Sequence, residues 1–195
     1  MMSKPRLTLL AATALLAAAP SWAATLYTLP AATAALETNN SVTANFTAGA
    51  GVGLVDFTVA GYATLDGDNG YIDILHVVLN GTEIFSGTWD LGGGGANRVL
   101  LNTNGATLGT ISNQQLSISI PLTLTAGSNQ LVFSYESPAS FEGSGRAGFQ
   151  GLGDEGWGLN AVTVNGNLAP VPEPASGALL LGGLGALAWL AKRRR

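Results

Sequence analysis

Apolar and polar side chains alternate with a period of two residues over much of the region between residues 24 and 169. In the clearest run every second residue is leucine or isoleucine, and serine, proline or threonine lies between them: Leu116, Ile118, Ile120, Leu122 and Leu124. This alternation predicts a strand with one buried face. Pro121 lies on the polar side and has no amide hydrogen, which favours an edge strand or a bulge.

A second strand is predicted over Tyr71 to Leu79. Asn80-Gly81 then suits the positive φ angles of a tight turn, and Thr82 to Ser86 returns as the other strand of a hairpin. Similar runs predict four more strands: Val42 to Phe46, Leu54 to Leu65, Leu131 to Tyr135 and Leu159 to Val164. Ala31 to Leu36 could form a short helix. Short strands separated by turn residues indicate an all-β fold, and we expect a jelly-roll-like β-sandwich.

Positive charge is concentrated at the two ends of the chain. Two of the eight lysines and arginines precede residue 24 and four follow residue 191, so the region 24–169 keeps only Arg98 and Arg146. That region holds eleven of the twelve acidic residues, and its net charge is therefore −9. Such a surface repels nucleic acid. The chain has no cysteine, which excludes thiol catalysis and thiolate metal sites.

The first 23 residues have the three parts of a secretory signal peptide. Lys4 and Arg6 form the basic part, Leu7 to Ala19 the apolar part, and Ser21-Trp22-Ala23 a small-x-small cleavage site. We therefore expect cleavage after Ala23 and export of one domain, residues 24–169.

The chain ends in a short motif, an apolar segment and a basic cluster. These are Val171-Pro172-Glu173-Pro174, the 17 residues from Ala175 to Ala191, and the cluster of Lys192, Arg193, Arg194 and Arg195. As a helix the apolar segment would be about 25 Å long, against ~30 Å for the hydrocarbon core of a bilayer. Flanking cations stay on the cytoplasmic side. We expect a single transmembrane helix, and an ordinary permanent anchor is the alternative to a sorting tail.

This tail, residues 170–195, resembles the PEP-CTERM sorting signal of Gram-negative bacteria that produce exopolysaccharide. The resemblance rests on Pro172-Glu173-Pro174, the glycines of the apolar segment, Trp189 and the basic cluster. It implies that the membrane protease-transpeptidase exosortase recognises the tail. It also implies transient residence in the inner membrane, followed by transfer to the cell surface or release into the extracellular matrix.

Parts of residues 24–169, the body of the chain, resemble the jelly-roll domains that accompany this tail. The segments are Thr64 to Asp73, Leu79 to Gly87 and Gly148 to Leu159. The strand after Trp157 is also similar to the last strand of carbohydrate-binding sandwich domains, where Trp-x-Leu-Asp-Asn-Val is common. Asn160-Ala161 replace the expected Asp-Asn, so a cation ligand on that strand is not carried over.

One turn gathers side chains with hard oxygen atoms: Asp66, Asp68, Asn69 and Asp73. Calcium binds six to eight such oxygens, often from a flexible loop. These four residues are therefore the candidate ligands of an irregular calcium loop, and a solvated Asp-Gly turn is the alternative. Gly70 and Val77 occupy ligand positions of an EF-hand, which excludes that motif. Asp154-Glu155, between glycines, is a second acidic candidate.

Other candidate chemistry is sparse. His76 is the single histidine and falls in a strand that is apolar on both faces, which favours a hydrogen-bonded interior or interface residue. The sequence contains no Gly-x-Ser-x-Gly elbow, and we expect no enzymatic activity. Trp89 and Tyr62 could stack against sugars or pack in the core.

Two functional hypotheses follow. The first is a non-enzymatic protein of the cell surface or matrix, sorted by exosortase, with a structural or adhesive role in the envelope or biofilm. The alternative is a carbohydrate-binding module for exopolysaccharide with structural calcium.

Overall fold

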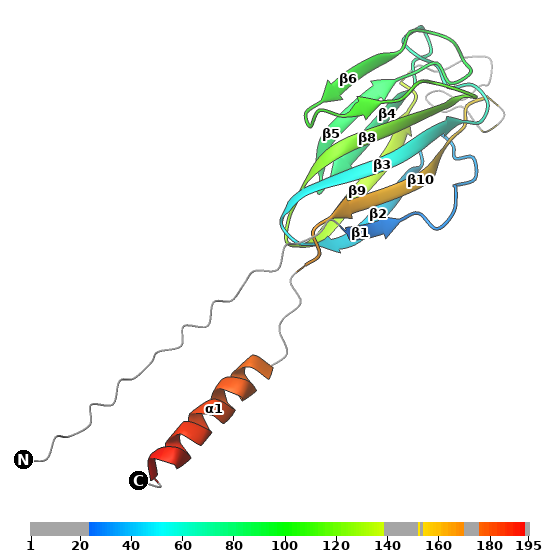
Figure 1. Ribbon diagram of the computed structural model, residues 1–195. Coiled ribbons are helices and arrows are strands. Elements are labelled where there is room, and N and C mark those ends of the chain that lie inside the picture. Colours follow the sequence, from blue (N-terminus) through cyan, green and yellow to red (C-terminus); the bar gives the residue numbers. More distant parts are fainter. Residues whose placement is uncertain (1–23, 139–151, 153, 170–175, 194–195) are drawn as a thin grey trace, which may run out of the picture.

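The computed structural model describes residues 24–138, 152, 154–169 and 176–193, which form two β-sheets and a C-terminal helix (Figure 1). The first sheet contains, in spatial order, β1 (Ala24–Thr28), β10 (Trp157–Gly166), β3 (Gly51–Gly61), β8 (Gln115–Leu124) and β7 (Thr107–Leu108). The second contains β2 (Ser41–Ala48), β9 (Gly127–Glu136), β4 (Ile74–Leu79), β5 (Thr82–Thr88) and β6 (Arg98–Asn102). The predicted signal peptide lies outside the described residues.

The chain passes repeatedly from one sheet to the other. Strands β1, β3, β8 and β10 lie in the first sheet, whereas β2, β4 and β9 lie in the second, so neighbours in space are mostly distant in sequence. The paired strands are antiparallel. The predicted all-β class is confirmed, and the strand order is compatible with a jelly roll.

The core lies between the sheets and is built by the alternation seen in the sequence. All five apolar residues of the run from Leu116 to Leu124 are buried on β8. Across the interface, Phe57 of β3 meets Phe133 of β9 edge-on, with ring centroids 4.9 Å apart. Pro121 pairs with Leu54 of β3 on one side of β8. On the other side β7 pairs only with Ile118 and Ser119, which agrees with the edge position expected for Pro121.

Two of the predicted strands reach further at one end than the observed ones, while most of the others are longer in the structure than predicted. Strand β4 begins at Ile74, not Tyr71, because Asp73 and Asp66 bond to each other: the Asp73 amide donates to the Asp66 carbonyl (3.0 Å). Strand β3 ends at Gly61, not Leu65.

The short helix predicted over Ala31 to Leu36 is wrong. This segment is extended, and the amides of Thr33 and Leu36 donate to the carbonyls of Leu159 and Trp157 (3.0 and 2.7 Å). Hydrogen bonds to β10 thus replace those that a helix would make within itself.

The C-terminal apolar segment is helical, as α1 (Ser176–Arg193). In the described part of the chain, no helix combines the length and the apolar character needed to cross a membrane. The 18 residues of α1 include four glycines and end in Lys192 and Arg193. The Arg193 guanidinium lies 4.1 Å from the centre of the Trp189 ring. Val171 to Pro174, Arg194 and Arg195 are outside the described residues.

The inter-sheet contact at Phe133 should dominate stability. Phe133→Ala removes a fully buried ring and should lower the free energy of unfolding by about 3–5 kcal/mol. Val52→Ala, at a position 81% exposed, is the control and should change it by less than about 0.5 kcal/mol. Urea denaturation of the full chain measures both. Equal losses in the two variants would contradict this description of the core.

Candidate functional site

Three buried carboxyl groups converge where the loops meet one end of the sandwich. Asp66 lies in the loop after β3, Asp73 immediately before β4, and Glu155 shortly before β10. One carboxylate oxygen from each lies within 4.8 Å of the others, the one such group of three that the described residues contain. The exposed fractions of Asp66, Asp73 and Glu155 are 8%, 0% and 1%. Acidic side chains are rarely buried to this extent unless they are compensated.

The backbone of the loops fixes this cluster. The Asp66 amide donates to Asp73 Oδ2 (2.7 Å), and the Thr88 hydroxyl donates to the Asp66 carbonyl (3.0 Å). Gly93 packs directly against the Asp66 carboxyl, since a Cβ atom at residue 93 would lie 2.6 Å from the Asp66 Cγ. The glycine-rich segment after β5 therefore serves for close packing, and Ala at this position would displace the carboxyl group.

Strand β9 supplies two hydroxyl groups to the same region. The Ser137 hydroxyl, just beyond β9, contacts both Asp73 Oδ1 and Glu155 Oε2, the latter at 2.8 Å. It has a single proton, so it can donate to only one of them at a time. Tyr135 is 3% exposed, and its ring lies 5.4 Å from that of Trp157. Its hydroxyl has no hydrogen-bond partner among the described residues.

Burial governs the protonation of the cluster. Desolvation, together with a hydrogen bond with Asp73 and the negative charge of Asp73, raises the pKa of Glu155 to about 8. Desolvation also raises the pKa of Asp73, although hydrogen bonds from Ser137 and the Asp66 backbone oppose this shift. Without a cation, the cluster therefore retains a proton near neutral pH. Full ionisation would require a compensating positive charge.

The structure brings together only part of the predicted calcium loop. Asp66 and Asp73 belong to the cluster. Asp68 instead forms an ion pair with Arg98 at the surface, and Asn69 donates its side-chain amide to Asp66 Oδ1 (2.7 Å). The side-chain oxygen of Asn69, Oδ1, accepts a hydrogen bond from the Tyr71 amide (2.6 Å), so it is already engaged. Asp68 and Asn69 are therefore corrected from ligands to supporting residues of the loop.

Glu155 is the member that the sequence did not connect with the others. Its alternation with Trp157 and Leu159, both fully buried, was the available signal, because it places Glu155 on the inward side of the chain entering β10. A parallel bridge between Thr64 and Glu155 then brings it beside the loop that contains Asp66.

The two candidate sugar-contact aromatics have different environments. Trp89 is 3% exposed and stacks on Phe85 with ring centroids 5.9 Å apart, so its assignment to a sugar-binding surface is wrong. Tyr62 is 42% exposed and donates its hydroxyl to the Thr33 carbonyl (3.1 Å). A sugar contact at Tyr62 stays a prediction.

His76 occupies the outer face of the second sheet, in a strand flanked by β9 and β5. It is half-buried there, with Nδ1 2.5 Å from Glu83 Oε1 and Nε2 3.4 Å from Glu136 Oε2. The central position predicted for its strand is confirmed. The histidine is hydrogen-bonded to Glu83 through Nδ1, whereas its Nε2 has no hydrogen-bond partner among the described residues.

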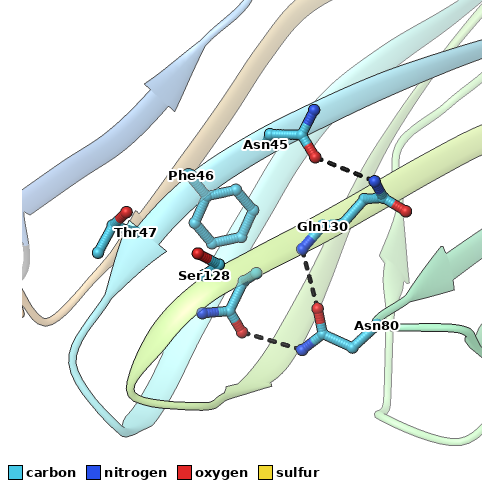
Figure 2. A pocket seen from close by; sticks show the side chains of 7 residues that line it. Asn45, Phe46, Thr47, Asn80, Ser128 and Gln130 are labelled. Carbon is cyan, nitrogen blue, oxygen red and sulfur yellow. Dashed lines mark hydrogen bonds between the residues drawn. The ribbon is translucent and has the colours of Figure 1, made fainter.

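A polar pocket of about 400 Å³ lies at the other end of β9 (Figure 2). Gln130 donates its side-chain amide to Asn45 (3.0 Å) and its backbone amide to the Asn80 side chain (2.8 Å). Asn80 in turn donates to Asn129 (3.0 Å). These amides line a hydrogen-bonding surface across β2, β9 and the turn after β4.

The raised pKa of Glu155 makes stability depend on pH when no cation is bound. In the unfolded chain this carboxyl ionises above its ordinary pKa of 4.5, whereas in the folded chain it stays protonated up to about pH 8. The folded state then holds more protons, so stability should fall as pH rises through this window, by up to about 1.4 kcal/mol per pH unit. Thermal denaturation in chelator measures this slope. Glu155→Gln should flatten it, and an unchanged slope would contradict the assignment.

Comparison with protein-family models identifies the C-terminal tail. No curated protein matches the chain. Residues 170–195 match the family model described as the PEP-CTERM protein-sorting motif. Helix α1 and the first two residues of the basic cluster belong to this stretch. The motif is the recognition signal of exosortase, and the chain is therefore an exported protein that exosortase sorts and processes at the membrane.

Proposed function

We propose that the body, residues 24–169, is a non-enzymatic structural or adhesive component of the cell surface or biofilm matrix. The observation that carries this proposal is the burial of the converging carboxyls. Asp73 and Glu155 are at most 1% exposed and are held by Ser137 and by backbone amides. A general acid or nucleophile must touch its substrate, whereas these groups connect loops to the core.

The exposed acidic residues support the same function. Asp68 pairs with Arg98, while Glu83 and Glu136 flank His76. Each of these carboxylates thus lies beside a cation or an imidazole on the surface. The negative charge of the body would keep it soluble and repel it from other acidic surfaces, as a matrix component requires.

Carbohydrate binding is the second candidate, and the polar pocket favours it. Asn45, Asn80 and Gln130 offer side-chain amides that can donate to and accept from sugar hydroxyls. The burial of Trp89 removes one stacking platform from this candidate. The pocket therefore supports a hydrogen-bonding mode of recognition for exopolysaccharide.

A complementation experiment tests the structural role. In a strain that lacks the protein, the full chain should restore both surface-attached protein and resistance of the biofilm to shear. A chain that ends at residue 169 should restore neither, because it lacks the tail. Phe133→Ala retains the tail but destabilises the body, so it should be processed without restoring cohesion. Full restoration by Phe133→Ala, or unchanged cohesion in the strain without the protein, would overturn the proposal.

Binding of the purified full chain to the host's exopolysaccharide tests the second candidate. Gln130→Ala removes hydrogen bonds from the pocket and should weaken binding about tenfold. Gln115→Ala on β8, an exposed glutamine of the other sheet, is the matched control and should leave binding unchanged. Absence of binding by the unmodified chain, or equal effects of the two substitutions, would remove this candidate.

A further inference from the structure

The buried cluster has the size of a cation site. Oxygen ligands lie 2.3–2.6 Å from a calcium ion, so two ligands on opposite sides of it are about 5 Å apart. The oxygens of Asp66, Asp73 and Glu155 fall within 4.8 Å of one another. A single ion between them could therefore contact all three without moving the strands apart.

The charge of the cluster also requires a counterion. The three carboxyls accept hydrogen bonds from three donors: the Ser137 hydroxyl, which has a single proton, the Asp66 backbone amide and the Asn69 side-chain amide. Arg98, the arginine in the described part of the body, pairs with Asp68 at the surface. No cationic side chain of the described residues enters the cluster, so a bound proton or a metal ion must balance the buried charge.

Tyr135 provides a second, independent indication of a ligand. Its side chain lies on the same face of β9 as Ser137, which touches both Asp73 and Glu155, and the charge of Asp73 acts on its phenol group. The hydroxyl is fully enclosed, and no described residue bonds to it. An unpaired buried hydroxyl costs about 1–3 kcal/mol, so its position beside the carboxyls is explained if it faces a bound ion or the water of that ion.

A cavity lies beside the cluster. It has a volume of about 310 Å³, and its lining includes Tyr135, Ser137 and Thr38. Two of these residues are the ones that border the cluster. The three carboxylates do not line this cavity, which borders the cluster at Tyr135 and Ser137, where water could supply the missing ligands of an ion.

We propose that Asp66, Asp73 and Glu155 bind one calcium ion after export, with the hydroxyls of Ser137 and Tyr135 facing it. The ligands are all oxygen atoms, which favours a hard cation over zinc or copper. Irregular loops that contribute carboxylates suit the variable coordination of calcium better than the strict octahedron of magnesium. The ion ties the loop after β3 and the entry of β10 to the end of β9.

The experiment uses the full chain in mild detergent, freed of metal with a chelator and titrated with calcium chloride by calorimetry. Magnesium chloride is titrated in parallel. Saturating calcium should raise the Tm by about 5 °C, because a ligand that binds only the folded state stabilises it by mass action. Magnesium should bind at least about tenfold more weakly.

Substitutions locate the ion. Glu155→Gln keeps the shape of the side chain but removes its charge, and should weaken calcium binding at least about tenfold. Asp68→Asn removes an acid that lies nearby but outside the cluster, and binding should be unchanged. Tyr135→Phe should raise the Tm in chelator, because it deletes an unpaired hydroxyl, and should reduce the gain on adding calcium.

Three results would overturn the proposal. The first is a Tm and a heat of titration that calcium leaves unchanged in the unmodified chain, which would mean that a proton alone balances the cluster. The second is a Glu155→Gln variant that binds calcium like the unmodified chain. The third is loss of binding in Asp68→Asn with retention in Glu155→Gln, which would place the ion in the exposed turn.

Discussion

The apolar side chains that both sheets direct inwards form the contact on which the rest of the body depends. Phe57 and Phe133 meet at the centre of this layer, and the alternating residues of β8 extend it along the first sheet. Because a strand reverses its faces with every residue, a shift of one residue in register would expose this whole set. The apolar layer therefore fixes the register of each strand, and with it the position of every loop.

The buried carboxyls lie where this layer ends. Strand β9 brings Ser137 to Asp73, and β10 begins just after Glu155, so polar groups from both sheets meet above Trp157. The apolar surroundings that stabilise the sandwich also remove water from the carboxyls and raise the pKa of Glu155. Stability of the core and chemistry of the cluster are thus two effects of the same burial.

The sequence was most informative where one local pattern determines structure. Alternation was sufficient for β8, and Asn80-Gly81 for the turn between β4 and β5, where Asn80 has a φ of 50°. Such local patterns were insufficient to place Glu155 in the carboxyl cluster. Contacts between residues far apart in the chain depend on how strands pair within a sheet and pack between sheets. Asp68 and Asn69 resembled ligands by spacing alone, but their side chains turn towards Arg98 and into the loop. For the apolar tail, the sequence indicated a helix correctly, and α1 occupies that segment.

The place of β10 in its sheet has a mechanical consequence. This strand leads directly towards the sorting tail, and it is hydrogen-bonded along both sides, to β1 and to β3. Ala24 pairs with Gly166, so the first strand begins and the last strand ends at the same end of the sandwich. When the far end of the body is held, a pull transmitted through residues 167–169 loads two ladders of hydrogen bonds in shear, and these must break together rather than one after another. The body therefore meets the sorting tail through a strand of its first sheet that hydrogen bonds hold on both sides.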